Sequence, residues 1–290
     1  MLLLQLLVNG LQTGALYALT AAGFSLIFGT TRVFHLAHGS AFVIAAYVFY
    51  ALAARAGAHW SLALLGAAAA AVLFGVLLDR VVYAPIRRHE GSFFTLFIAS
   101  LGSAIVVQNV VGIAFGRSVV TVSTPLSRSA EVLPGVFVAP LAGVAIGCAL
   151  VCFWLLQRFL GSTQRGVALR ALAENAELVR AYGLHPARLS TLAFALGSLL
   201  VVPAAALTVA TSGANPAMGN HVMLISLAAT IVGGVGSLRG AACAGLLLGM
   251  AENLALWRLE PQWSEAVTFV VLLGFILVRP TGFFGRAHAH

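Results

Sequence analysis

Long apolar segments, separated by short polar loops, dominate this chain of 290 residues and limit what it can fold into. Hydrophobic residues make up 61% of the sequence and charged residues only 8%, against about 25% charged residues in soluble domains. A helix of about 20 apolar residues crosses a bilayer, and lipid leaves no backbone polar group unpaired. The pattern therefore predicts an all-α polytopic membrane protein with roughly eight to ten transmembrane or re-entrant helices in one domain.

The predicted membrane segments are 2–29, 38–54, 60–83, 93–116, 136–157, 189–211, 222–236, 240–256 and 264–279. Residues 222–236 are few for a full crossing at about 1.5 Å per residue. This segment and 240–256 therefore either cross twice or form a re-entrant pair, and both alternatives leave the two termini on opposite sides. Between the fourth and fifth segments, a strand-like alternation at 119–122 precedes Pro125 and Pro134.

The arginines are divided unequally between the two sides of the membrane. If residues 158–188 are cytoplasmic, twelve arginines lie inside and four outside. The inner set is Arg32, Arg80, Arg87, Arg88, Arg158, Arg165, Arg170, Arg180, Arg188, Arg239, Arg279 and Arg286, and the outer set is Arg55, Arg117, Arg128 and Arg258. Because basic residues favour the cytoplasmic side, the bias predicts an outside N-terminus and a cytoplasmic C-terminus.

The interval Arg158–Arg188 is the one long stretch of the sequence that cannot lie in lipid. We expect a helix over 166–182, which Gly183 ends and Pro186 follows as a breaker. One face carries Leu172, Ala176 and Val179 with Tyr182 alongside, and another carries Arg170, Glu174, Glu177 and Ala181. Glu177 and Arg180 are spaced to pair at i, i+3. Such a helix either lies on lipid headgroups or inserts into a groove of a soluble subunit.

Several kinds of chemistry are excluded by the residue types present. The chain has no lysine, so it contains neither a Walker A loop nor a Schiff-base lysine. His35 and His38 have no carboxylate or cysteine beside them, and the three cysteines have no nearby histidine or acid, so we expect no metal site. The arginines lie in short loops rather than among aromatics, which argues against nucleic-acid binding. We expect no catalytic residue and no cofactor.

Polar residues inside the apolar segments either form helix–helix hydrogen bonds or line a path for a solute. They are Asn9, Gln12, Gln108, Asn109, Thr230, Glu252 and Asn253. The glycine-rich break Gly233–Gly240 permits either close helix packing or an unwound turn. Together with the glycine-containing, basic stretch Gly29–Ser40, it hints at an internal repeat.

Motifs spread over most of the chain resemble the permease subunits of branched-chain amino acid ABC importers, in particular the first of the two permease types. The matching stretches are Tyr17–Leu19, Phe34–Gly39, Tyr83–Arg87, Ile98–Gly102, Gln108–Asn109, Arg170–Asn175, Gly183–Leu184, Gly233–Ser237, Gly240, Leu248–Gly249 and Glu252. His35 and Leu36 depart from the family pattern, which concerns the solute rather than the fold. Members of this family also import urea, short amides and aromatic acids.

The resemblance implies a multi-pass subunit of the bacterial inner membrane, without enzymatic activity of its own. Its implied partners are a second permease, identical or not, two cytoplasmic ATPase subunits and a periplasmic solute-binding protein, besides membrane lipid. The resemblance also implies that the Ala173–Leu184 region couples to the ATPase, through Arg170, Ala173, Glu174, Asn175, Glu177, Arg180 and Gly183. We predict a translocation pathway along Asn9, Gln12, His38, Gln108, Asn109, Thr230, Gly233, Gly234, Gly236 and Glu252. The alternatives are a stand-alone secondary transporter or channel and, in another class, an intramembrane enzyme.

Overall fold

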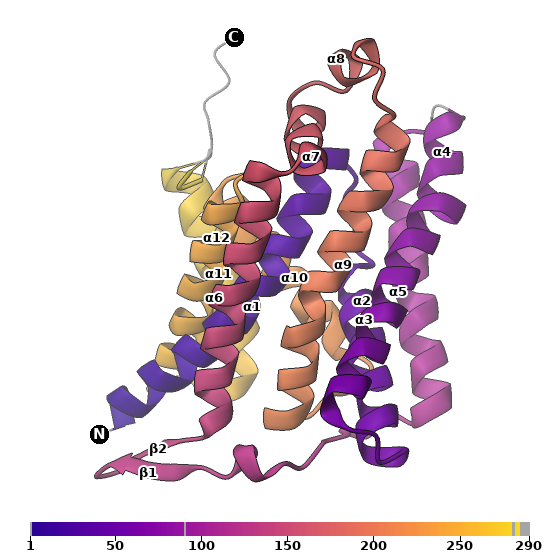
Figure 1. Ribbon diagram of the computed structural model, residues 1–290. Helices are drawn as coiled ribbons and strands as arrows, with labels where there is room; N and C mark the ends of the chain where they lie inside the picture. The colour runs from indigo at the N-terminus through magenta and orange to yellow at the C-terminus, as the bar shows by residue number, and fades with distance from the viewer. Residues whose placement is uncertain (1, 90, 280–281, 285–290) are drawn as a thin grey trace.

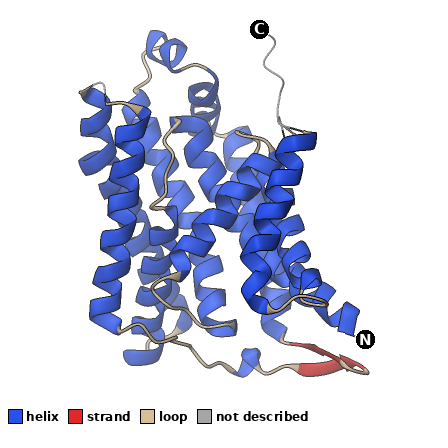
Figure 2. Ribbon diagram, turned by 180° about the vertical axis from the view of Figure 1, so that it is seen from behind, coloured by secondary structure: helices blue, strands red, loops and turns tan. Residues whose placement is uncertain are grey.

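Long helices that run between the same two ends of the molecule form the fold (Figure 1). The computed structural model describes residues 2–89, 91–279 and 282–284. In this described part, six helices are long and apolar enough to cross a bilayer. Figure 2 shows the molecule almost entirely as helix, with one small hairpin at an end. The predicted all-α polytopic fold is confirmed, while the number of crossings and the orientation of the termini stay predictions.

Each predicted apolar segment overlaps one long helix. These helices are α1 (Leu2–Thr31), α2 (His38–Tyr50), α3 (Trp60–Leu77), α5 (Phe93–Phe115), α6 (Pro140–Ser162), α9 (Pro186–Thr211), α10 (Met218–Gly233), α11 (Leu238–Ala255) and α12 (Ser264–Val278). A π-helical turn, Ala51–Arg55, extends α2, and another, Leu78–Tyr83, joins α3 to the short helix α4 (Ala84–Arg88). Two 3-10 turns lie at Pro125–Ser127 and Pro261–Trp263.

The wide π-helical turn before α4 has a local cause in Pro85. A proline inside a helix donates no N–H, and its ring collides with the carbonyl four residues earlier. A π-helical turn widens the backbone at that point and accommodates the proline. The turn also presents Asp79 and Tyr83 to the interior, where they are 1% and 0% exposed.

The central helix α1 packs against α11 through small residues. With 30 residues, α1 is about 45 Å long and exceeds the roughly 30 Å hydrocarbon layer, which agrees with its tilt in Figure 1. A Cβ atom on Gly10 would lie 3.0 Å from the Cα of Met250, and one on Gly14 would lie 2.7 Å from the carbonyl oxygen of Leu246. Glycine spacing of this kind lets two helix backbones approach closely in lipid.

The two ends of the bundle differ in what covers them, and we name them the hairpin end and the α7–α8 end (Figure 1). At the hairpin end, β1 (Ala130–Leu133) pairs antiparallel with β2 (Val136–Val138). The side chain of Gln5 holds β2 by donating to the carbonyl of Phe137 at 2.9 Å and accepting from its N–H at 2.7 Å. The strand-like alternation at 119–122 gives only an isolated bridge between Val120 and Ala214.

Two shorter helices, α2 and α10, begin inside the bundle rather than at its ends. Nε2 of His38, at the start of α2, is 2.9 Å from the carbonyl oxygen of Thr20, which lies about 16 Å before the end of α1. Gly219, near the start of α10, contacts Gly39. Residues 32–37 reach this level from the α7–α8 end, whereas residues 212–217 reach it from the hairpin end, where Ala214 pairs with Val120.

These two breaks enter the bundle from opposite ends. The Gly233–Gly240 break lies instead near the end of α1, where Gly236 is close to Gly29, and the internal repeat stays a prediction.

Candidate coupling and transport sites

The polar interval folds into two short helices, α7 (Gln164–Glu174) and α8 (Ala176–Ala181), so the prediction of one helix over 166–182 was wrong. Asn175 takes an extended conformation, and its side chain accepts hydrogen bonds from the N–H groups of Glu177 and Leu178 at 2.9 and 3.0 Å. This side chain caps α8 and interrupts the helix. Gly183, at φ +75°, ends α8 as predicted.

The break at Asn175 also changes which residues share a face. Leu172 and Val179 are buried, as expected, but Ala176 and Tyr182 are exposed. The four charged residues predicted to couple, Arg170, Glu174, Glu177 and Arg180, all lie on the exposed surface. Among the described residues, no ion pair joins Glu177 to Arg180, so the expected i, i+3 pairing is not formed.

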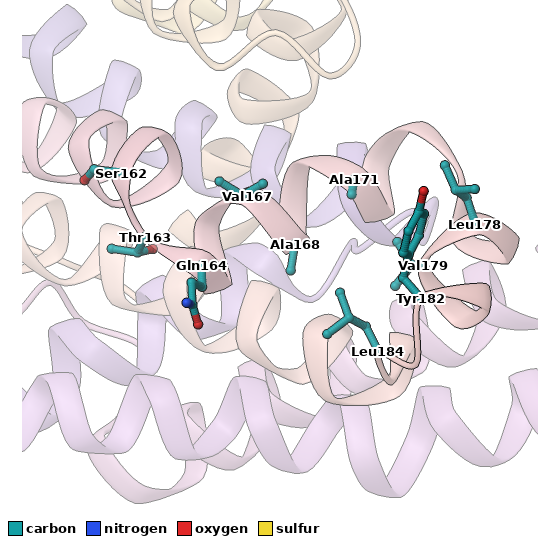
Figure 3. Close-up of a pocket in the computed structure, with 10 residues that line it drawn as sticks. All are labelled: Ser162, Thr163, Gln164, Val167, Ala168, Ala171, Leu178, Val179, Tyr182 and Leu184. Atoms are coloured by element: carbon teal, nitrogen blue, oxygen red, sulfur yellow. The ribbon is translucent and has the colours of Figure 1, made fainter.

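An apolar groove of about 430 Å³ lies between α7 and α8. Figure 3 shows its lining side chains, which are Ser162, Thr163, Gln164, Val167, Ala168, Ala171, Leu178, Val179, Tyr182 and Leu184. Tyr182 is 78% exposed and Leu178 is 53% exposed. Exposed apolar patches on a polar surface segment mark binding sites for other molecules. The sequence did not predict this groove, although Val167, Leu178 and Leu184 are apolar residues in an otherwise polar interval.

The helix α7 contacts the parts of the bundle that end beside it. The guanidinium of Arg32, which follows α1, donates to the carbonyl oxygen of Ala173 at 3.5 Å. A small cavity is shared by Gly29 and Thr30 of α1, Arg170 and Ala173 of α7, and Gly236. A displacement of α7 therefore acts directly on the end of α1 and on the glycine-rich turn.

The glycine-rich break Gly233–Gly240 is a tight turn at the α7–α8 end, and it joins α10 to α11. Gly233 and Gly240 are in direct contact, and Ser237 caps α11 by accepting from the N–H of Gly240 at 3.1 Å. The contact between Gly233 and Gly240 corresponds to the close helix packing that the sequence analysis gave as one of two alternatives. It places Gly233, Gly234 and Gly236 away from Gln108 and Asn109, with which they were predicted to share a pathway.

The helix α11 runs beside α1 over most of its length. At the α7–α8 end, Gly29 of α1 faces Gly236, and toward the other end Gly10 faces Asn253. Two predicted pathway residues bond within their own helices, since Thr230 donates to the carbonyl of Ser226 and Asn109 to that of Ile105, each at 2.8 Å. Asn9 likewise accepts from Gln5 of the same helix at 2.9 Å, and Gln12 is partly buried on α1.

Glu252 lies in a buried hydrogen-bonded cluster that joins α1, α10, α11 and α12. Tyr17 donates to one carboxylate oxygen at 2.9 Å, and Thr268 donates to the other. The Tyr17 hydroxyl is also 3.0 Å from Nε2 of His221, whose Nδ1 is 3.3 Å from Glu265. Since both carboxylate oxygens are paired, the geometry favours a structural role for Glu252 over contact with a solute.

Replacing Glu252 by alanine is expected to lower the free energy of unfolding by about 2–3 kcal/mol, because Tyr17 and Thr268 lose their acceptor in a buried site. Glu252→Gln should lose less, since its amide oxygen still accepts one of the two hydrogen bonds. Thermal unfolding of the purified protein in detergent measures both losses. Equal midpoints for the wild type and both variants would contradict this assignment.

A second buried network fixes the start of α2. Nδ1 of His35 is 2.9 Å from the hydroxyl of Tyr83, which donates to Ser100 at 2.8 Å, and Ser100 accepts from the N–H of Ala37 at 3.0 Å. His38, predicted to line the pathway, is wholly buried. Within residues 2–89, 91–279 and 282–284, no group of three histidine, cysteine or acidic residues could hold a metal ion.

Asp79 forms a third cluster, which the sequence did not predict. Its buried carboxylate pairs with Arg87 at 2.5 Å and accepts from the hydroxyls of Ser190 at 3.0 Å and Thr191 at 2.7 Å. Ser190 and Thr191 lie in the second turn of α9, which follows α8 after a short turn. The cluster therefore links the chain that leaves α8 to α3 and α4.

Together, the apolar bundle and the polar helical pair at one end define a polytopic membrane transport protein. The family model described as branched-chain amino acid transport system / permease component matches residues 6–276. The chain therefore belongs to this family of permease components. The resemblance to permease subunits of ABC importers is confirmed, as is the prediction of a multi-pass protein of the inner membrane.

Individual relatives agree with this assignment. High-affinity branched-chain amino acid transport system permease protein BraD of Pseudomonas aeruginosa is 31% identical, over 98% of this chain and 96% of the relative. Permease protein LivH of Salmonella typhimurium is 29% identical with the same coverage. PsaBC from Streptococcus pneumoniae, solved in complex with Fab, matches 94% of this chain at a TM-score of 0.55 and 13% identity, which shows a shared fold.

Proposed function

We propose that this chain, as one transmembrane permease domain over residues 1–290, is the translocation subunit of an importer driven by separate ATPase subunits. One of two cytoplasmic ATPases binds the groove between α7 and α8, a periplasmic binding protein delivers solute at the hairpin end, and a second permease completes the pathway. The absence of lysine supports this division, because a P-loop ATPase needs one.

The groove between α7 and α8 is the observation that carries this proposal. It has exposed apolar side chains, Leu178 and Tyr182 among them, and the same two helices carry the exposed charged residues Glu174, Glu177 and Arg180. A helix lying on lipid headgroups presents an apolar face to the membrane, whereas α8, which contributes to the groove, lies beyond the ends of the long helices (Figure 1). That position favours a soluble partner.

For the solute we propose a branched-chain amino acid, as the names of the relatives state for them, or a related small solute such as urea, an amide or an aromatic acid. The test is uptake of radiolabelled leucine, urea and phenylalanine by cells that express the whole transporter. Import should persist when a protonophore removes the ion gradient and should stop when the ATPase subunit is deleted. Import that follows the ion gradient and needs no ATPase would instead favour a secondary transporter.

A further inference from the structure

The first turns of α2 and α10 meet at the middle of the bundle. A Cβ atom on Gly219 would lie 2.9 Å from the carbonyl oxygen of Gly39. A Cβ atom on Gly39 would overlap the carbonyl oxygen of Gly219. The two backbones are thus in contact, and any separation of α2 from α10 starts at this point. Both helices direct their partly positive N-terminal ends here, one from each side of the membrane.

Three polar side chains lie beside this contact, around a cavity with room for about one water molecule. They are Ser40 of α2, Gln108 of α5 and Asn220 of α10, and the rest of the lining is largely apolar. Asn220 donates to Gln108 across 3.5 Å, at the upper limit for a hydrogen bond.

Ser40 is the least satisfied member of this group. It is only 6% exposed, and its hydroxyl makes no hydrogen bond to any other described residue, although it borders the cavity. Glu252, Tyr83 and Ser100, by contrast, all have bonded partners. The Ser40 hydroxyl borders the cavity beside the two helix ends and is therefore free to bind a ligand there in another state.

We propose that the Gly39–Gly219 contact is the closed gate of the transport path, and that Ser40, Gln108 and Asn220 bind the carboxylate of the solute when it opens. This rests on the proposed function and names where its substrate binds. Hydroxyl and amide donors beside two helix N-termini suit an anionic group. No charged side chain lines the cavity, so a zwitterion meets no competing ion pair.

Cysteine accessibility in the whole transporter, expressed in cells, tests this proposal. Cys148, Cys152 and Cys243 are replaced by alanine, and Ser40, Gln108 and Asn220 are then replaced singly by cysteine. Ile113→Cys, on the same helix as Gln108 but 87% exposed on the outer surface of the bundle, is the matched control. Each variant is treated with anionic sulfonatoethyl and cationic trimethylammonioethyl methanethiosulfonate, with and without cellular ATP.

In cells with ATP, the three cysteines should react at least about tenfold faster than Ile113→Cys, because thiolates form in water and not in lipid. The ratio of anionic to cationic rates should exceed that of Val119→Cys, in the exposed loop, by about tenfold. Labelling rates equal to those of Ile113→Cys would contradict the claim that the three residues line an aqueous path. An anionic-to-cationic rate ratio equal to that of Val119→Cys would contradict the claim that they bind a carboxylate.

Co-purification with the ATPase identifies any variant that fails to assemble, and the remaining two positions then decide the result. Failure of the proposed function is a separate outcome. If wild-type cells import none of the solutes tested, the solute assignment fails, whereas the labelling rates still decide whether Ser40, Gln108 and Asn220 line an aqueous path.

Discussion

Replacing Leu178 by aspartate is expected to weaken binding of the ATPase subunit by about two orders of magnitude. Leu178 is half exposed in the groove between α7 and α8, and a bound partner would remove the new carboxylate from water without pairing it. Burial of an unpaired charge of this kind costs about 3 kcal/mol or more, and every 1.4 kcal/mol is tenfold in affinity. Titration of the detergent-purified permease with the ATPase measures the change.

Ala187→Asp provides the matched control for Leu178→Asp. Ala187 is exposed in the first turn of α9, at the same end of the molecule but outside the groove. Aspartate is compatible with the start of a helix, so the fold should be unaffected. If both variants bind the ATPase like the wild type, the groove is not the docking surface.

Replacing Asp79 by alanine is expected to destabilise the protein by about 3 kcal/mol. The change leaves the guanidinium of Arg87 without its buried partner and removes the acceptor of Ser190 and Thr191. The thermal midpoint in detergent should fall by about 5 °C or more. Import should fall further than this loss explains, since the second turn of α9 is no longer held to α3 and α4.

Two comparisons separate these effects of Asp79. Asp79→Asn keeps an acceptor for Thr191 but no charge for Arg87, so its midpoint should lie between those of the wild type and Asp79→Ala. Arg80→Ala removes an exposed charge from the same π-helical turn and should leave the midpoint near that of the wild type. A midpoint for Asp79→Ala equal to that of Arg80→Ala would show that the buried pair does not stabilise the fold.

Features that depend on local sequence were predicted well. Apolar length located every long helix, because the hydrocarbon layer fixes how many residues a crossing needs. Gly183 ends α8 because a left-handed residue there favours glycine. Asn175 shows the limit of periodicity, since one capping side chain divides a pattern that is continuous on a helical projection.

Features that depend on distant segments could not be predicted. Tyr17 and Glu252 are 235 residues apart, and Thr191 is 112 residues from Asp79. The sequence marks Glu252 as an acid in an apolar segment, which predicts that it faces the bundle interior or a cavity but not which residues it contacts, and it gave no prediction for Asp79. The contact of Gly39 with Gly219 likewise depends on two breaks that enter the bundle from opposite ends.

The most direct test of the central claim is a cross-link from α8 to the ATPase. Tyr182, 78% exposed at the edge of the groove, is replaced by cysteine in the cysteine-free chain and treated with a short thiol-to-amine cross-linker in the assembled transporter. We predict a product that contains this chain and the ATPase, and whose yield changes when ATP is added. A thiol that reacts fully with a small water-soluble reagent but gives no product with the ATPase would contradict the account.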